Sequence, residues 1–259
     1  MGKLLIGTSG YDYPEWKGVF YPEKTARNKF LEYYATQFNS IELNGTYYRM
    51  PTAKQMQNMV KRTGGKVQFS VKAFNGLTHN LNNSQYQVVV SDIKKALEPL
   101  QTNNVLLCLL LQFPQSFHYD KGQRIYLDAL LKEITDIPLV VEMRNSKWQN
   151  DNVYNALRQR NIGWCIGDYP KIKNLPKLDF LHTSDIAYFR LHGRNAEMWY
   201  KGDNVTRYDY LYTDNELQTM IDPIRYLLKH AAIVQIFFNN HAKSQAVINA
   251  RKLELLLKT

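Results

Sequence analysis

Apolar residues recur along this chain in eight short runs that are rich in β-branched and aromatic side chains. The runs are spaced about 20–50 residues apart, and amphipathic segments lie between them. Runs of this length and composition are typical of buried strands in a parallel sheet. The predicted strands cover residues 4–9, 40–44, 67–72, 105–112, 139–144, 162–168, 186–192 and 233–239.

Apolar side chains at helical spacing indicate helices between several of these strands. Thr213 and Glu216 form a possible capping box before one of them. Residues 171–185 contain Pro176 and directly follow Pro170, so only a short helix is expected there. The apolar helix faces comprise Val89, Ile93, Ala96 and Leu100; Leu127, Leu130, Leu131 and Ile134; Leu217, Ile221, Ile224 and Leu228; and Ala246, Ala250, Leu253 and Leu257.

Eight strand–helix repeats without a linker or low-complexity segment predict a (β/α)₈ barrel of the α/β class, forming one domain over residues 1–259. An open, doubly wound sheet is the alternative. Such a sheet usually carries a glycine-rich phosphate turn after its first strand. Residues 7–10 read Gly-Thr-Ser-Gly, which does not match G-x-G-x-x-G, and no P-loop is present.

The seventh predicted strand alternates in character. Tyr188, Arg190 and His192 fall on one side, and Ala187, Phe189 and Leu191 fall on the other. A strand covered on both faces is usually apolar throughout, so this strand either has a solvated edge or ends in a functional site.

All eight predicted strands end in polar or ionisable side chains, whereas their amino ends are apolar. In a barrel the carboxyl ends of the strands meet around the axis, where the active site lies. We therefore predict a polar ring there; the alternative is a structural network of salt bridges. With the largest apolar residues facing the helices, the inward ends comprise Thr8, Glu42, Asn44, Lys72, Gln112, Glu142, Arg144, Asp168, Arg190, His192 and Asn239.

Several motifs in this order resemble the YecE-like family, also called domain of unknown function 72. The similarity runs from about Leu4 to Leu257, and it implies a TIM-type barrel and a cytoplasmic, mostly bacterial protein without an established reaction. The chain departs from the family pattern at two positions. Tyr11 stands where the family usually has a tryptophan, and Asn145 follows Arg144 where the family usually has a histidine. The motifs lie at residues 7–11 (GTSGY), 16–18 (WKG), 20–22 (FYP), 42–48 (ELNGTYY), 72 with 78–79 (K, TH), 112–114 (QFP), 142–144 (EMR), 190–193 (RLHG) and 238–241 (FNNH).

Three cations of the ring suit a phosphate or carboxylate: Lys72, Arg144 and Arg190. The alternative is that they neutralise the acids of the ring. In the first case, the expected substrate-binding residues are these three cations together with Asn44, Gln112, Asp168, Asn239 and Thr8.

We expect an enzyme in which His192, with Glu42 or Glu142, transfers protons. A glycosidase is less favoured, because the neighbouring cations would lower the pKa of its acid. A metal-dependent hydrolase or isomerase is a weaker alternative. Its ligands would come from Glu42, Glu142, Asp168, His192 and His241, but no tight metal-binding motif occurs, so neither metal nor cofactor is predicted.

A formal net charge of +10 favours anionic partners, either small molecules or nucleic acid. Tyrosines and tryptophans interleaved with basic residues follow several strands, and they suit base stacking in a nucleic-acid-binding protein or nuclease. The alternative is that these rings pack the loops over the barrel. Residues 194–213 are long enough to form a lid.

Cys108 and Cys165 lie in apolar runs, which indicates buried reduced thiols. No apolar run reaches membrane-spanning length, and the amino terminus shows neither a signal peptide nor a myristoylation signal. We expect a cytoplasmic protein without a membrane partner. The sequence does not indicate an oligomeric state.

Overall fold

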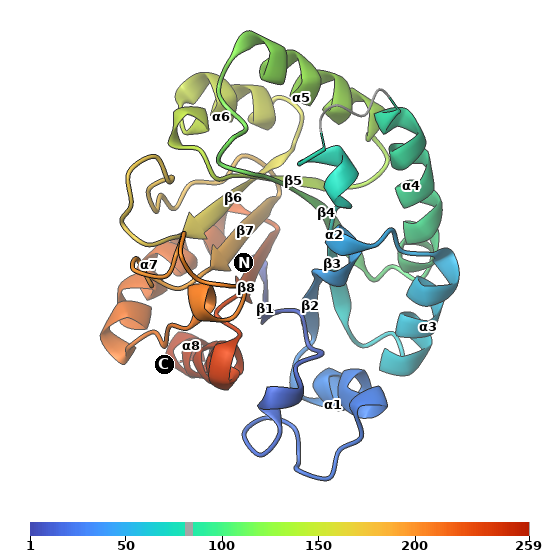
Figure 1. Cartoon of the computed structure of the whole chain (residues 1–259), viewed down its shortest axis with the longest axis vertical. Coiled ribbons are helices and arrows are strands. Elements are labelled where there is room, and N and C mark those ends of the chain that lie inside the picture. Colours follow the sequence, from blue (N-terminus) through green and yellow to red (C-terminus); the bar gives the residue numbers. More distant parts are fainter. Residues whose placement is uncertain (81–84, 259) are drawn as a thin grey trace.

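The computed structural model describes residues 1–80 and 85–258, and its strands close into a parallel barrel in chain order (Figure 1). Residues 81–84 and Thr259 of the predicted domain lie outside the described part. The predicted barrel is confirmed, and each predicted strand is found within two residues of its expected ends. The strands are β1 (Lys3–Ser9), β2 (Ser40–Leu43), β3 (Gln68–Lys72), β4 (Leu106–Phe113), β5 (Leu139–Met143), β6 (Gly163–Asp168), β7 (Ile186–Leu191) and β8 (Ile233–Phe238).

Helices surround the barrel, but they do not follow every strand (Figure 1). Two helices connect β2 with β3, whereas residues 169–185, all described, form turns and no helix between β6 and β7. The short helix expected in residues 171–185 is therefore wrong. In the described part the α-helices are α1 (Phe30–Gln37), α2 (Gly45–Tyr48), α3 (Ala53–Thr63), α4 (Tyr86–Thr102), α5 (Lys121–Glu133), α6 (Asp151–Arg158), α7 (Asp214–His230) and α8 (Gln245–Lys258).

Capping explains where some helices begin. Thr213 accepts a hydrogen bond from the Glu216 amide, and the Glu216 side chain accepts one from the Thr213 amide, which confirms the predicted capping box of α7. Thr52 and Gln55 form the same motif before α3. Each box satisfies backbone donors that the first helical turn leaves without partners.

Successive side chains of each strand point to opposite sides of the barrel wall, so the strands contribute to one apolar layer outside the barrel and another inside it. Trp164 and Ile166 of β6 belong to the large core between strands and helices, whereas Cys165 belongs to a small cluster inside the barrel. Both cysteines are buried and free, as expected. The inner cluster comprises Cys108, Leu110, Val140, Cys165, Ile186, Tyr188 and Phe237.

Two neighbouring strand pairs are joined by fewer residues than the others. β1 and β2 pair at two positions, and β5 and β6 also pair at two. The other neighbours share four to six paired positions. We call these two junctions the short seams. They divide the barrel into a half formed by β2–β5 and a half formed by β6–β8 with β1.

None of the helices in the described residues is long and apolar enough to cross a membrane.

Candidate active site

Arg190 of β7 is the centre of a buried polar cluster at the carboxyl end of the barrel. Its Nη2 donates to Glu42 Oε1 of β2 at 2.7 Å, and its Nη1 donates to Glu142 Oε2 of β5. Arg190 is 1% exposed and both carboxylates are 0% exposed. Two buried carboxylates thus share one guanidinium. This arrangement matches the alternative in which the cation neutralises acids of the ring.

Tyrosine hydroxyls bind the remaining carboxylate oxygens. Tyr188 donates to Glu42 Oε2 at 2.7 Å, and Tyr169 donates to Glu142 Oε1 at 2.8 Å. All four oxygens of the two carboxylates therefore have donors. We call Glu42, Glu142, Arg190, Tyr169 and Tyr188 the Arg190 cluster.

The charges of the cluster stabilise one another. Burial alone would lower the pKa of Arg190, but Glu142 and Glu42 raise it well above its ordinary value. Burial alone would raise the pKa of Glu142, but the charge of Arg190 lowers it well below the usual range. Glu142 is therefore ionised at neutral pH and cannot serve as a resting general acid.

His192 is a neutral neighbour of this cluster. Asn239 Nδ2 lies 3.0 Å from His192 Nδ1, and His192 Nε2 lies 3.3 Å from Glu142 Oε1. Because Glu142 accepts hydrogen bonds, we assign the proton of the ring to Nε2. Burial lowers the pKa of His192 to about 3, although Glu142 opposes that shift. His192 therefore lacks the near-neutral pKa that makes an ordinary histidine suited to proton transfer.

Arg144 extends from the cluster toward the loops. Its Nε lies 3.3 Å from Glu142 Oε1, its Nη2 lies 3.3 Å from the Tyr208 hydroxyl, and its side chain is 16% exposed. Burial would raise the pKa of Tyr208, but the charge and hydrogen bond of Arg144 lower it overall. Trp199, from the same loop as Tyr208, lies 5.8 Å from the guanidinium carbon.

Lys72 lies at the end of β3, with its ammonium nitrogen 4.0 Å from the centre of the Tyr47 ring. It makes no ion pair with any residue that the structure describes. Burial and the charges of Arg190 and Arg144 lower the pKa of Lys72 to about 7. Lys72 is thus a partly buried amine with a pKa near neutrality.

The expected inward placement of Thr8 and Asp168 is wrong. Thr8 Oγ1 donates to the Tyr34 hydroxyl of α1, so it faces the helix layer. Asp168 shares the outward face of β6 with Trp164 and Ile166. Its carboxylate instead binds Arg194, at 2.9 and 3.1 Å, and the Tyr212 hydroxyl at 2.6 Å. Neither residue joins the Arg190 cluster.

The expected substrate-orienting amides lie around the carboxyl end in different roles. Gln112 pairs with Glu142 across β4 and β5, but its Nε2 donates to the Phe113 carbonyl at 2.8 Å. Asn239 holds His192, as described above. Asn44 precedes α2, and its Oδ1 is buried without a hydrogen-bond donor from the described residues.

The residues of the metal alternative are not gathered into one site. Asp168 turns away, and His241 stacks on Tyr13 while its Nε2 lies 3.0 Å from the Asn204 carbonyl oxygen. Across residues 1–80 and 85–258, no group of three His, Cys, Asp or Glu side chains is arranged to hold a metal ion.

Cavities flank the cluster on two sides of the carboxyl end. One, of about 540 Å³, is lined by Tyr13, Asn44 and Tyr48 among others. Another, of about 1070 Å³, is lined by Tyr169 and Arg194 and by much of residues 171–179. The second cavity reaches the cluster through Tyr169, whose hydroxyl donates to Glu142.

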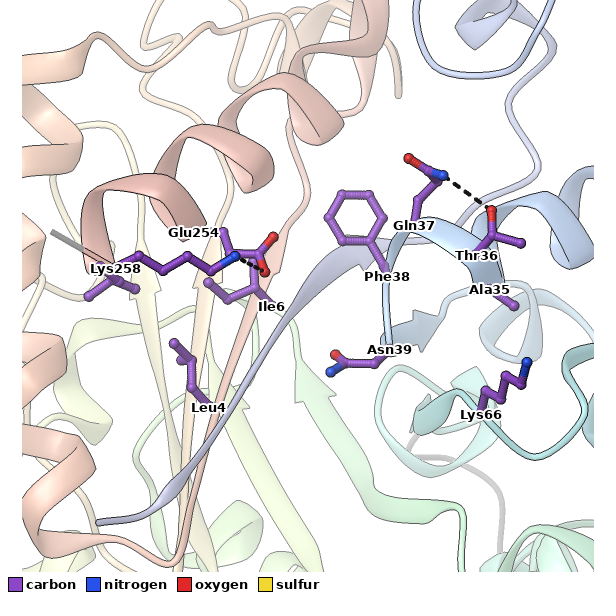
Figure 2. Close-up of a pocket in the computed structure, with 11 residues that line it drawn as sticks. Leu4, Ile6, Ala35, Thr36, Gln37, Phe38, Asn39, Lys66, Glu254 and Lys258 are labelled. Atoms are coloured by element: carbon purple, nitrogen blue, oxygen red, sulfur yellow. Dashed lines mark hydrogen bonds and ion pairs between the residues drawn. The ribbon is translucent and has the colours of Figure 1, made fainter.

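A further cavity, of about 360 Å³, lies at the opposite end of the barrel (Figure 2). Leu4 and Ile6 of β1 face Phe38 and Asn39 across it, and Lys258 of α8 bonds to Glu254 at 3.2 Å nearby. It opens beside the short seam between β1 and β2, away from the Arg190 cluster.

Three tyrosines contact the charged groups although the sequence does not predict a place for them in the polar ring: Tyr169, Tyr188 and Tyr208. Tyr188 lies on the same face of β7 as Arg190, so the two-residue period of the strand was enough to predict its place in the site. Tyr169 follows from the same period, because Cys165 and Gly167 face inward on β6. Tyr208 lies in the loop of residues 194–213, and no sequence pattern places it against Arg144.

Comparison with known proteins agrees with this geometry. The model of "Protein of unknown function DUF72" matches residues 5–259. The UPF0759 protein YunF of Bacillus subtilis is 31% identical, over 98% of this chain and 94% of its own length.

Solved structures resemble the whole barrel. A DUF72 family protein of Thermotoga maritima, TM1631, superimposes with a TM-score of 0.92 at 34% identity, over 99% of this chain and 100% of its own. A DUF72 family protein of Enterococcus faecalis, EF0366, gives a TM-score of 0.88 at 22% identity, over 99% and 96% of the two chains. The chain belongs to the DUF72 family, also known as YecE-like, whose members carry no assigned function in these descriptions.

Proposed function

We propose that this protein is an enzyme that binds a small phosphate- or carboxylate-bearing substrate at the carboxyl end of its barrel. The observation that supports this proposal most strongly is that the three cations differ in how far carboxylates neutralise them. Arg190 is paired with two carboxylates, whereas Lys72 has no carboxylate partner among the described residues and Arg144 is partly exposed. With Lys72 protonated, three cations oppose two carboxylates, which leaves one positive charge for an anion.

Lys72 and Arg144 are therefore the proposed anion-binding pair, and Arg190 becomes a positioning residue. Arg144 offers planar donors that suit phosphate and carboxylate oxygens. Glu42, Glu142 and His192 are the residues that we expected to transfer protons, but their polar atoms face one another in a buried network. We assign proton transfer instead to Lys72 and Tyr208, whose pKa values are shifted toward neutrality.

A thermal unfolding titration with inorganic phosphate and citrate at low ionic strength tests this proposal. Ligand that binds only the folded state raises the stability, by about 2.7 kcal/mol at 100 times Kd. We expect a saturable rise in Tm for the wild type. Lys72→Met and Arg144→Ala should remove most of it, whereas Arg124→Ala, on the exposed face of α5, should retain it. An equal rise in all four proteins would contradict the proposed site.

The protection should also depend on pH. The Lys72 amine is protonated below its pKa of about 7 and neutral above it. Phosphate protection should therefore be strongest below pH 7 and weaken as the pH rises through that value, although phosphate itself becomes more negative. Sulfate, whose charge is constant over this range, provides the control anion. Protection by sulfate that does not change between pH 6 and pH 9 would exclude Lys72 from the anion site.

The aromatic loops do not support a second proposal. Trp16, Trp148, Trp199 and Tyr212 are buried in the folded chain, so they are not available for base stacking. Tyr48 and Tyr200 remain 67% and 57% exposed, but scattered exposed rings are common on protein surfaces. Nucleic-acid binding stays a prediction of the sequence.

A further inference from the structure

We propose that Lys72 is a covalent nucleophile that condenses with an aldehyde or ketone group of an anionic substrate to form an imine. This inference rests on the proposed function, because it names the chemical class of the substrate that the same site would take. It changes the role of Lys72 from an electrostatic contact to the group that bonds to the substrate.

The structure holds this amine in place without neutralising it. The Thr46 hydroxyl of α2 bonds to the Lys72 carbonyl oxygen at 2.6 Å and to the Leu43 carbonyl oxygen at 3.0 Å, so it joins the start of α2 to the end of β3. Asn75 Nδ2 donates to the Tyr47 carbonyl at 2.9 Å and fixes the loop that carries this ring. The Tyr47 face then lies 4.0 Å from the Lys72 nitrogen.

The surroundings of Lys72 favour its neutral, nucleophilic form. An amine that is partly desolvated beside other cations loses its proton more readily, which is a recognised route to a reactive lysine. Arg190 and Arg144 are those cations, and both keep their charge because they are paired with Glu142. Because its pKa is lowered to about 7, Lys72 supplies far more free amine at pH 7 than an ordinary exposed lysine does.

The covalent step is balanced without any oxidant or reductant. The Lys72 lone pair attacks the carbonyl carbon, a C–N bond forms, and the carbonyl π electrons move to oxygen. After the nitrogen loses a proton and the oxygen gains one, the hydroxyl is protonated and leaves as water, while the C=N bond forms and the nitrogen releases its second proton. The products are one imine and one water molecule. The Tyr208 hydroxyl, held 3.3 Å from Arg144 Nη2, is the proposed proton donor and acceptor on this side of the site.

The test is reductive trapping on the intact protein. Pyridoxal 5′-phosphate combines an aldehyde with a phosphate, and pyridoxal lacks the phosphate, so they form a matched pair of probes. The protein is incubated at pH 7 with a limiting amount of each probe and is then reduced with borohydride. The adducts are mapped by peptide mass spectrometry. Pyruvate with cyanoborohydride extends the test to a ketone that carries a carboxylate.

We expect one dominant adduct, on Lys72, formed at least about tenfold more efficiently with pyridoxal 5′-phosphate than with pyridoxal. Lys72→Met and Lys72→Arg should lose it. Lys147→Met, at an exposed lysine that follows β5, should retain it. The thermal unfolding of each variant confirms that it is folded. Labelling spread over the exposed lysines, or unchanged in Lys72→Met, would overturn the inference.

The two proposals can fail separately. If phosphate protects the wild type from unfolding but no probe labels Lys72, the anion site stands and the imine is wrong. If both probes label Lys72 equally and phosphate gives no protection, the nucleophile stands and the anion site is wrong.

Discussion

At the scale of single residues, Arg190 decides the arrangement of the charged groups. It is buried with two carboxylates, and each remaining carboxylate oxygen has a tyrosine donor. Loss of one partner from a buried ion pair is costly, because the other charge remains without compensation.

Arg190→Met should therefore lower the free energy of unfolding by about 3–5 kcal/mol. The comparison variant is Arg62→Met, which removes a partly exposed pair with Glu32 and should cost about 1 kcal/mol or less. Urea unfolding at pH 7 measures both. Similar losses in the two variants would mean that Arg190 is not the essential counter-ion of the cluster.

Lys72→Met should raise the free energy of unfolding at pH 7 by about 1.4 kcal/mol or more, because a shift of one pKa unit corresponds to about 1.4 kcal/mol. Its pKa is about 7 when folded and 10.5 ordinarily, so between these values the unfolded chain binds a proton that the folded chain does not. The stability of the wild type should therefore rise with pH across this window.

The measurement is urea unfolding of wild type and Lys72→Met at pH 7 and pH 9.5, with Lys147→Met as the control. The rise between the two pH values should be present in the wild type and in the control, and it should be reduced in Lys72→Met. If Lys72→Met shows the same rise, then the folded protein does not hold Lys72 with a lowered pKa.

The sequence predicted which residue types collect at the carboxyl end, but not all of their directions. Glu42, Glu142, Arg190 and His192 meet as expected, because period-two strands in a barrel bring alternate side chains to the axis. Asp168 does not meet them, because it lies at an even-numbered position of β6 like Trp164 and therefore shares the outward face of that strand. The low pKa of His192 follows from complete burial, which the sequence does not show.

At the scale of elements, the loop of residues 194–213 is tied down at its base. Arg194 binds Asp168 of β6 and, at 2.9 Å, Glu216 of α7, while the Tyr212 hydroxyl accepts from the Gly193 amide at 2.9 Å. The sequence predicted a segment long enough for a lid. It did not predict these anchors, because Asp168 was expected to face the axis.

Arg194→Ala should loosen this loop while the barrel stays folded. The pair with Asp168 is partly buried, and its loss should speed tryptic cleavage after Lys201 roughly tenfold, which corresponds to about 1.4 kcal/mol in local opening. Lys201 is exposed in the middle of the loop. Arg27→Ala, which breaks an exposed pair with Asp12, is the control. An unchanged cleavage rate would show that other contacts hold the loop.

At the scale of the whole molecule, the Arg190 cluster joins the two halves that the short seams separate. Arg190 and Tyr188 lie on β7 in one half, whereas Glu42 and Glu142 lie on β2 and β5, the two edge strands of the other. These interactions therefore cross the barrel from one half to the other, and Glu142 lies just beyond the last paired position of the β5–β6 seam.

Hydrogen exchange followed by mass spectrometry tests this role. In Arg190→Met, amides of β1, β2, β5 and β6 should exchange faster than in the wild type, by a larger factor than those of β3 and β4. Arg62→Met again serves as the control. A uniform increase in all strands would indicate general destabilisation without a weakened junction between the halves.

The connection between β6 and β7, which consists of turns, has a practical consequence. Its exposed lysines, Lys171 and Lys173, lie in a stretch that contributes to the large cavity beside Tyr169, and no strand pairing depends on them. Exposed connections of this kind accept inserted sequence readily. A fluorescent amino acid introduced at Lys173 would report directly on ligand arrival at the carboxyl end, without any need to follow turnover.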